Sequence, residues 1–130
     1  MMYAFLLLTA LVAVTTAVAQ EPNLRNIRQL TFGGDNAEAY FSPDGTKLCM
    51  QSNNKAWGLQ CDQIFWVDIA KAAGDSSYHP PMVSNGEGRT TCSYYMTNNT
   101  HILYGSTIEG GNECPPPPVP RADRKYLWQV

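Results

Sequence analysis

Cysteine and histidine are the residue types in this chain that most readily hold a metal or perform redox chemistry. The chain of 130 residues contains the following six: Cys49, Cys61, Cys92, Cys114, His79 and His101. A structural zinc site takes four sulfur or nitrogen ligands, with pairs of ligands separated by only a few residues. No two of the cysteines form a Cys-x-x-Cys pair, and each histidine stands apart from them. The sequence therefore predicts no metal site and no cofactor.

Nucleophilic and acid–base chemistry is equally unsupported. There is no Gly-x-Ser-x-Gly motif, and the sequence specifies no histidine partner for Ser84 or Ser93. Asp44 and Asp68 are the carboxylates that one would consider as a catalytic pair, but roles in a turn and at a strand end explain both. We therefore predict no catalytic residues within this chain.

The charge balance excludes two classes of partner. The chain carries 9 Lys and Arg against 11 Asp and Glu, which gives a net charge of −2 and a sequence pI near 5.5. Binding to phosphate backbones requires a basic surface, so neither nucleic acid nor an anionic membrane is the expected partner. With 44% hydrophobic and 15% charged residues, the chain has the composition of a folded domain.

Residues 1–19 resemble a signal peptide. An apolar run from Phe5 to Val14 precedes Ala17-Val18-Ala19, the small-x-small pattern that signal peptidase accepts, so cleavage would leave Gln20 first. The n-region lacks Lys and Arg, and the alternative is an uncleaved anchor, although a bilayer span needs about 20 apolar residues. We expect a secreted protein, or a periplasmic one in a bacterium, without stable membrane insertion after cleavage.

The chain repeats itself with an offset of 54 residues. Residues 40–48 align with residues 94–102, so that an aromatic pair, a four-residue turn and an apolar strand occur twice. In the first copy the turn is Ser42-Pro43-Asp44-Gly45, in which each residue type suits its turn position. In the second copy Asn98 and Asn99 stand in place of Asp44 and Gly45, and asparagine tolerates positive φ. Both copies are therefore predicted to be β-hairpins.

The hydrophobic pattern around these turns predicts an all-β fold. The expected strands are 37–41, 47–51 and 63–69 in the first copy, and 91–96, 102–105 and 126–130 in the second. The weak helical spacing at 67–73 is interpreted as a strand followed by a turn. Residues 64–67 are apolar on both faces, which requires sheets stacked face to face.

Four cysteines in an exported chain are most simply two disulfides, and three connectivities are possible. The expected strand directions bring Cys61, Cys92 and Cys114 to one end of the sheets, which favours a Cys92–Cys114 bridge. Cys49 lies within a strand. If its Cα lies more than about 7 Å from that of Cys61, Cys49 is a buried free thiol.

Three segments of the first copy resemble a blade of the TolB-like, WD-repeat-like β-propellers: Arg28-Gln29-Leu30-Thr31, then residues 41–48, then residues 62–68. The resemblance implies antiparallel blades, with blade one at 20–78 and a truncated blade two at 79–130 that carries a proline-rich insert at 115–120. Closed propellers have about four to eight blades, so two blades form an incomplete ring. We expect a fragment of a longer propeller; the alternatives are a protomer that closes a ring with its own copies and a two-blade sandwich held by disulfides.

The resemblance implies a protein-binding scaffold without catalysis of its own, because function in such folds lies in grafted loops. The partner protein is not specified, and self-association to complete a propeller is one possibility. A second interpretation is the N-terminal propeller of a prolyl oligopeptidase-type serine peptidase whose hydrolase domain is missing. A third is a self-assembling two-blade structural protein.

Two further motifs lie on expected loops. Asn98-Asn99-Thr100 is an N-glycosylation sequon at a hairpin tip, and Asn98 is the candidate acceptor in a eukaryotic source. The prolines of segment 115–120 match a polyproline ligand for SH3 or WW domains. Those domains are chiefly intracellular, so in an exported chain we interpret the segment as a stiff loop.

Overall fold

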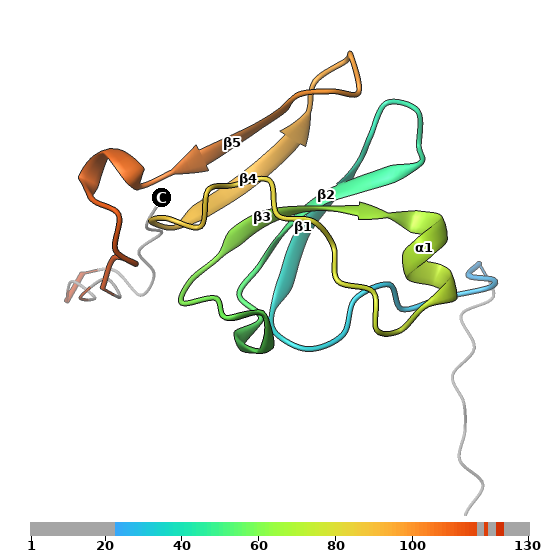
Figure 1. The fold of residues 1–130 in the computed structure, drawn as a ribbon, viewed down its shortest axis with the longest axis horizontal. Helices are drawn as coiled ribbons and strands as arrows, with labels where there is room; N and C mark the ends of the chain where they lie inside the picture. The colour runs from blue at the N-terminus through green and yellow to red at the C-terminus, as the bar shows by residue number, and fades with distance from the viewer. Residues whose placement is uncertain (1–22, 117–118, 120–121, 124–130) are drawn as a thin grey trace, which may run out of the picture.

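The computed structural model describes residues 23–116, 119 and 122–123, and within them the chain forms two antiparallel sheets (Figure 1). The strands are β1 (Asn36–Phe41), β2 (Lys47–Ser52), β3 (Gln63–Asp68), β4 (Thr90–Tyr95) and β5 (Ile102–Ser106). The first sheet has the order β1-β2-β3, and the second pairs β4 with β5. The all-β expectation is confirmed, and each of these strands ends within one residue of its expected bounds. The sixth expected strand, 126–130, lies outside the described residues.

The register of the first sheet separates its two faces. Leu48 lies opposite Phe41 and Val67, whereas the next residue, Cys49, lies opposite Tyr40 and Trp66. Because successive side chains point to opposite faces, the two trios lie on different sides of the sheet. The face that carries Leu48 holds the hydrophobic core, whose members are Met50, Phe65, Val67 and Ala72 with Leu30, Leu48, Trp57, Leu59 and Tyr78 packed against them.

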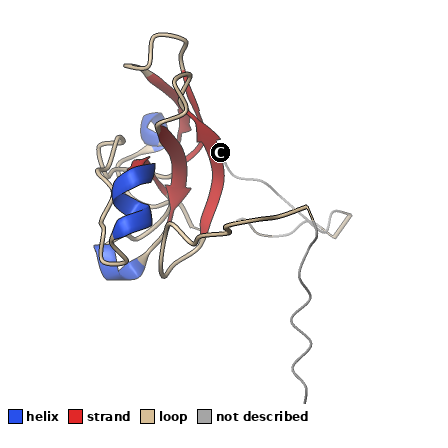
Figure 2. Cartoon of the chain, turned by 90° about the vertical axis from the view of Figure 1, so that its right-hand side faces the viewer, coloured by secondary structure: helices blue, strands red, loops and turns tan. Residues whose placement is uncertain are grey.

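The second sheet covers the other face of the first. Strand β4 packs on β2 and also touches β1 and β3, and it lies between β5 and the first sheet in Figure 1. Figure 2 shows the helical segments gathered to one side of the strands. The two-sided burial expected of β3 is therefore observed: Ile64, Phe65 and Val67 are all buried.

One expected turn is a short helix. After β3 the chain forms α1 (Ile69–Gly74), so the interpretation of 67–73 as strand and turn is wrong beyond Asp68. The Asp68 side chain accepts a hydrogen bond from the Lys71 N–H at 3.1 Å, which satisfies a donor of the first turn. Alanine has the highest helix propensity, and Ala72 buries its methyl group in the core.

Both hairpin turns have the expected geometry. In the first, Ser42 N–H donates to the Lys47 carbonyl at 2.9 Å, and Gly45 has φ of 70°. In the second, Met96 N–H donates to the His101 carbonyl at 2.9 Å, and Asn99 has φ of 60°. Asparagine therefore takes the left-handed position that glycine holds in the first turn.

The repeat extends to the irregularities of the strands. Glu38 in β1 and Cys92 in β4 both have φ of 52°, and each lies where the register shifts within its hairpin. A residue left unpaired at such a shift forms a β-bulge. Since Glu38 and Cys92 are 54 residues apart, the bulge belongs to the repeated unit.

Hydrogen bonds at the ends of the hairpins recur at the same spacing. Asn53 N–H donates to the Asp35 carbonyl at 3.2 Å, and the Asn53 side chain accepts from the Asp35 N–H at 2.9 Å. Thr107 N–H donates to the Arg89 carbonyl at 3.0 Å, and the Thr107 hydroxyl accepts from the Arg89 N–H at 2.9 Å. The same pair of contacts thus closes each hairpin.

A 3₁₀ turn follows each hairpin: η1 (Lys55–Trp57) and η2 (Ile108–Gly110). These turns are 53 residues apart, so the second copy has lost one residue before its turn. We call residues 34–61 the first repeat and residues 88–114 the second repeat. The structure thus contains one backbone design twice.

Candidate functional site

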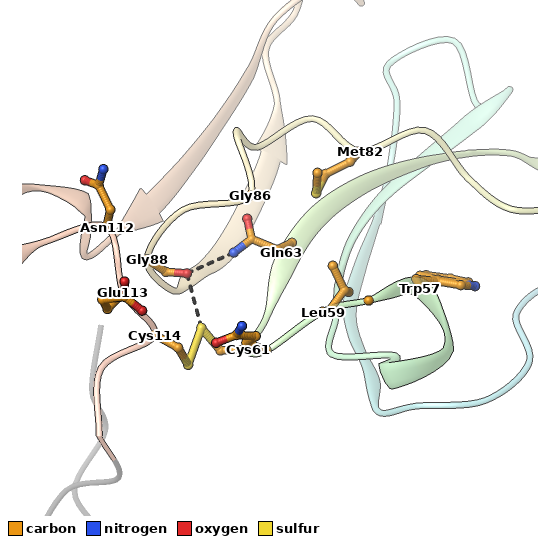
Figure 3. Close-up of a pocket in the computed structure, with 12 residues that line it drawn as sticks. Trp57, Leu59, Cys61, Gln63, Met82, Gly86, Gly88, Asn112, Glu113 and Cys114 are labelled. Atoms are coloured by element: carbon orange, nitrogen blue, oxygen red, sulfur yellow. Dashed lines mark hydrogen bonds between the residues drawn. A yellow bond between two sulfur atoms is a disulfide. The ribbon is translucent and has the colours of Figure 1, made fainter.

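A cleft of about 320 Å³ lies where loops of both repeats meet. Its lining comes from residues 57–61, from Gln63 and Met82, from the glycines of the loop before β4, and from residues 112–114. In Figure 3, Asn112 and Glu113 lie on one side of a disulfide, and Trp57, Leu59 and Met82 lie on the other.

The disulfide joins Cys61 to Cys114, with a Cα–Cα distance of 5.9 Å and a sequence separation of 53. The bridge therefore links the same position of the two repeats. The expected Cys92–Cys114 bridge is wrong, because Cys92 forms the bulge of β4, where its N–H donates to the Glu38 carboxylate at 3.0 Å. Cys92 is exposed and Cys49 is buried in β2, both as free thiols.

A buried glutamine fixes the wall of the cleft. Gln63 is 2% exposed; its amide nitrogen donates to the Gly88 carbonyl at 2.9 Å, and its amide oxygen accepts from the Ser84 hydroxyl at 2.7 Å. Ser84 in turn accepts from the Ile64 N–H at 2.9 Å. Each of these polar groups is paired, and such satisfied networks hold buried side chains in one arrangement. Ser84 serves as a structural link, with no histidine among its hydrogen-bond partners.

Gly88 shapes the cleft by bringing two loops close together. It has φ of 61°, and a Cβ there would lie 2.9 Å from the Thr107 hydroxyl oxygen. Its counterpart in the first repeat, Gly34, has φ of 67°, and a Cβ there would lie 2.6 Å from the Asn54 Cα. Each repeat therefore requires glycine at this point, where the chain enters the hairpin beside its 3₁₀ turn.

The rim of the cleft combines acidic and apolar groups. Glu87 accepts hydrogen bonds from the side-chain amides of Asn85 at 2.9 Å and Asn112 at 3.4 Å. Glu113 lines the cleft and is exposed. On the apolar side, Trp57 stacks on His79 with ring centroids 4.6 Å apart. His79 therefore packs against an aromatic ring in this structure.

The two carboxylates considered in the sequence lie in structural hydrogen bonds. Asp44 accepts from the Ser42 hydroxyl at 2.6 Å and from the N–H and hydroxyl of Thr46. These bonds, led by the one from Ser42, lower the pKa of Asp44 from 3.8 to about 2. Asp68 caps α1. Both side chains act in turn and strand-end positions, as expected from the sequence.

The sequon asparagine lies at the tip of the second hairpin. The Asn98 side chain is exposed; its oxygen accepts from the N–H groups of Thr100 and His101 at 3.1 and 3.2 Å. Its nitrogen lies 2.8 Å from Nδ1 of His101. Of the proline-rich segment, residues 117–118 and 120 lie outside the described residues, as do residues 1–19, the predicted signal peptide.

Sequence reasoning did not identify the cleft. Gln63, Ser84 and Gly88 come from three separate segments, and no local pattern joins them. One signal was present: Gly34 and Gly88 are 54 residues apart, the same offset as the hairpins, and this marks Gly88 as a required position of the repeat.

Within the described residues, no group of three or more His, Cys, Asp or Glu side chains could hold a metal ion. In the same part of the chain, no helix has the length and hydrophobicity needed to cross a bilayer. The sequence matches no protein-family model, and comparisons with curated proteins and with solved structures find no significant similarity.

Proposed function

We propose that this chain is a segment of a TolB-like β-propeller that acts outside the cytoplasm as a protein-binding scaffold, with no catalysis of its own. The observation that carries the proposal is the repetition of one hairpin design, including its turn, bulge and closing hydrogen bonds. Propeller blades are such repeated antiparallel sheets, each covered on both faces. The proposed blades are residues 20–78 and 79–130.

The location follows from the cysteines and the N-terminal segment. Structural disulfides persist in oxidising compartments, and the Cys61–Cys114 bridge fits such a compartment. Residues 1–19 act as the signal peptide in this proposal. The protein is secreted in a eukaryote or periplasmic in a bacterium.

The binding site of the scaffold is the cleft beside the disulfide. Loops of both repeats form it, and the disulfide together with the Gln63 hydrogen bonds holds these loops in place. The exposed carboxylates of Glu87 and Glu113 favour a partner segment that carries a basic residue. The exposed Met82 side chain and the Trp57 ring offer an apolar contact beside them. A basic segment of a protein with an apolar neighbour fits this surface.

Site-specific photo-cross-linking in the native host tests this proposal. A photoreactive residue replaces Gln60 or Glu113 at the cleft, and in the matched control it replaces Ala70, which is exposed on α1. We expect a cross-linked species heavier than the chain from the two cleft positions only, and its yield should fall when Glu87→Lys is added.

Equal cross-linking from Ala70, or none from the cleft positions, would contradict a binding site in the cleft. A free chain with an intact N-terminal segment in the cytoplasm would contradict export. The two parts of the proposal are thus tested separately.

A further inference from the structure

The two repeats leave different parts of their surfaces open. Tyr40 and Cys49 are cross-strand neighbours in the first repeat, and Tyr94 and Leu103 are the neighbours at the equivalent positions of the second. We call the sheet face that carries each pair the front of its repeat. Cys49 is fully buried because the second sheet covers it, whereas Leu103 is 67% exposed. The front of the second repeat is therefore uncovered.

On the opposite side, the residue of the second repeat is buried and the equivalent residue of the first repeat is exposed. Phe41 in the first repeat and Tyr95 in the second follow the front tyrosines, so they point to the other face, which we call the back. Tyr95 is 4% exposed because it packs toward the first sheet, whereas Phe41 is 66% exposed. The β1 part of this back is therefore open at Phe41, whereas Met50 and Val67 on the same face are buried in the hydrophobic core.

The open β1 part of the back also carries an apolar hollow. Beside β1 lies a cavity of about 310 Å³, lined on one side by Leu30, Leu48, Met50 and Val67. The interface inside the chain shows what such a back packs against: Tyr95 of the second repeat covers the front of the first. If a second chain repeats this arrangement, its Phe41 lies on Leu103 of the first chain, because Phe41 and Leu103 are the equivalents of Tyr95 and Cys49.

We propose that copies of this chain associate head to tail, with the front of the second repeat of one chain covering the β1 part of the back of the first repeat of the next. Leu103 then meets Phe41 and the adjacent hollow, two surfaces that are both apolar and open in the single chain.

The contact between chains is weaker than the contact inside one. Within the chain, Gln51 accepts a hydrogen bond from the Thr91 hydroxyl at 2.6 Å, and the equivalent of Gln51 is Gly105, which has no side chain to replace it. The internal interface also benefits from the covalent link between its halves. Association should therefore depend on concentration. This inference concerns the sheet faces and does not rest on the binding proposed for the cleft.

Two charge substitutions test the head-to-tail arrangement, because every contact uses one front and one back. Phe41→Asp places a charge on the back of the first repeat, and Leu103→Asp places one on the front of the second repeat. Both side chains are exposed, so the fold should persist. We expect the wild-type mass in sedimentation to rise with concentration and each variant alone to be monomeric. Mixed in equal amounts, the variants should form a one-to-one dimer and nothing larger.

The matched control is Ile27→Asp, which changes an exposed apolar residue outside both repeats and should associate as the wild type does. A wild-type chain that stays monomeric up to about 1 mM, the range of weak binding, would overturn the proposal. Single variants that still dimerise would also overturn it, because that result indicates a symmetric contact. If an aspartate variant is unfolded by circular dichroism, Phe41→Ser and Leu103→Ser replace the pair, with the same expected results.

Discussion

Asp44 links a turn to the pH dependence of stability. The pKa of its carboxyl group is lowered from 3.8 to about 2 by the hydrogen bonds from Ser42 and Thr46. A carboxylate whose pKa is lower in the folded state stabilises the fold above pH 4, and this contribution is lost as the pH falls toward 2. We expect the free energy of unfolding to decrease over this range.

The control for this measurement is Asp44→Ala, which removes the titrating group. Asp75 also has a lowered pKa because Ser77 donates to it, so part of the acid dependence should remain in the variant. The difference between the two denaturant-unfolding curves at each pH isolates Asp44. If wild type and Asp44→Ala lose stability in parallel between pH 4 and 2, the hydrogen bonds of Asp44 do not favour its charged form.

The disulfide is a second feature at the scale of single residues. Closing a loop with a sequence separation of 53 stabilises the fold by about 4 kcal/mol in the loop-entropy model. The double substitution Cys61→Ala and Cys114→Ala should therefore lower the free energy of unfolding by about 3–4 kcal/mol. Cys92→Ser, at an exposed free thiol, should have no comparable effect. Peptide mapping without reduction gives an independent check, since any peptide that contains Cys92 in a bridge contradicts the observed pairing.

At the scale of elements, the glycine before each hairpin is the most constrained position. Gly34→Ala places a methyl group 2.6 Å from the Asn54 Cα at a φ of 67°, and a backbone atom cannot move aside as a flexible side chain can. We expect a loss of about 2 kcal/mol or more, consistent with strain at such positions. Gly110→Ala is the matched control, because nothing lies within 4 Å of its Cβ. Similar melting temperatures for the two variants would argue against this close approach.

The strands were predictable because their ends are marked by local chemistry. Ser42-Pro43-Asp44-Gly45 defines the first turn, and the offset of 54 transfers its position to the second. Helix α1 was missed because its six residues are too few for a hydrophobic period, so that its one strong signal is the cap at Asp68.

The disulfide pairing and the cleft were not predictable for a different reason. The argument for Cys92 assumed regular strands, but the bulge at Cys92 changes the direction of its side chain. The cleft depends on contacts between Gln63, Ser84 and Gly88, which the packing of separate segments creates. Local sequence patterns report on neighbours along the chain and carry no information about such contacts.

At the scale of the whole molecule, export and glycosylation are tested by the intact mass of the protein from its source. If residues 1–19 are a cleaved signal peptide, the N-terminus is Gln20. In a eukaryotic source or host, we expect Asn98 to carry a glycan because its side chain is exposed at a hairpin tip. Treatment with a glycosidase or the substitution Asn98→Gln should then remove the same extra mass. An N-terminus at Met1 would contradict cleavage, and an unchanged mass after glycosidase would contradict occupancy.

The position of the disulfide has a mechanical consequence. Because Cys61 and Cys114 are covalently joined, tension applied to the two ends of the chain passes from one sulfur to the other and bypasses residues 62–113. The hairpin of β4 and β5 thus bears no load. Residues 62–113, which would span about 180 Å when fully extended, add no length under force. Within the described residues, a pull acts on those outside the loop that the bridge closes, including the first hairpin. Reduction of one bond would release the remaining length in a separate, later step.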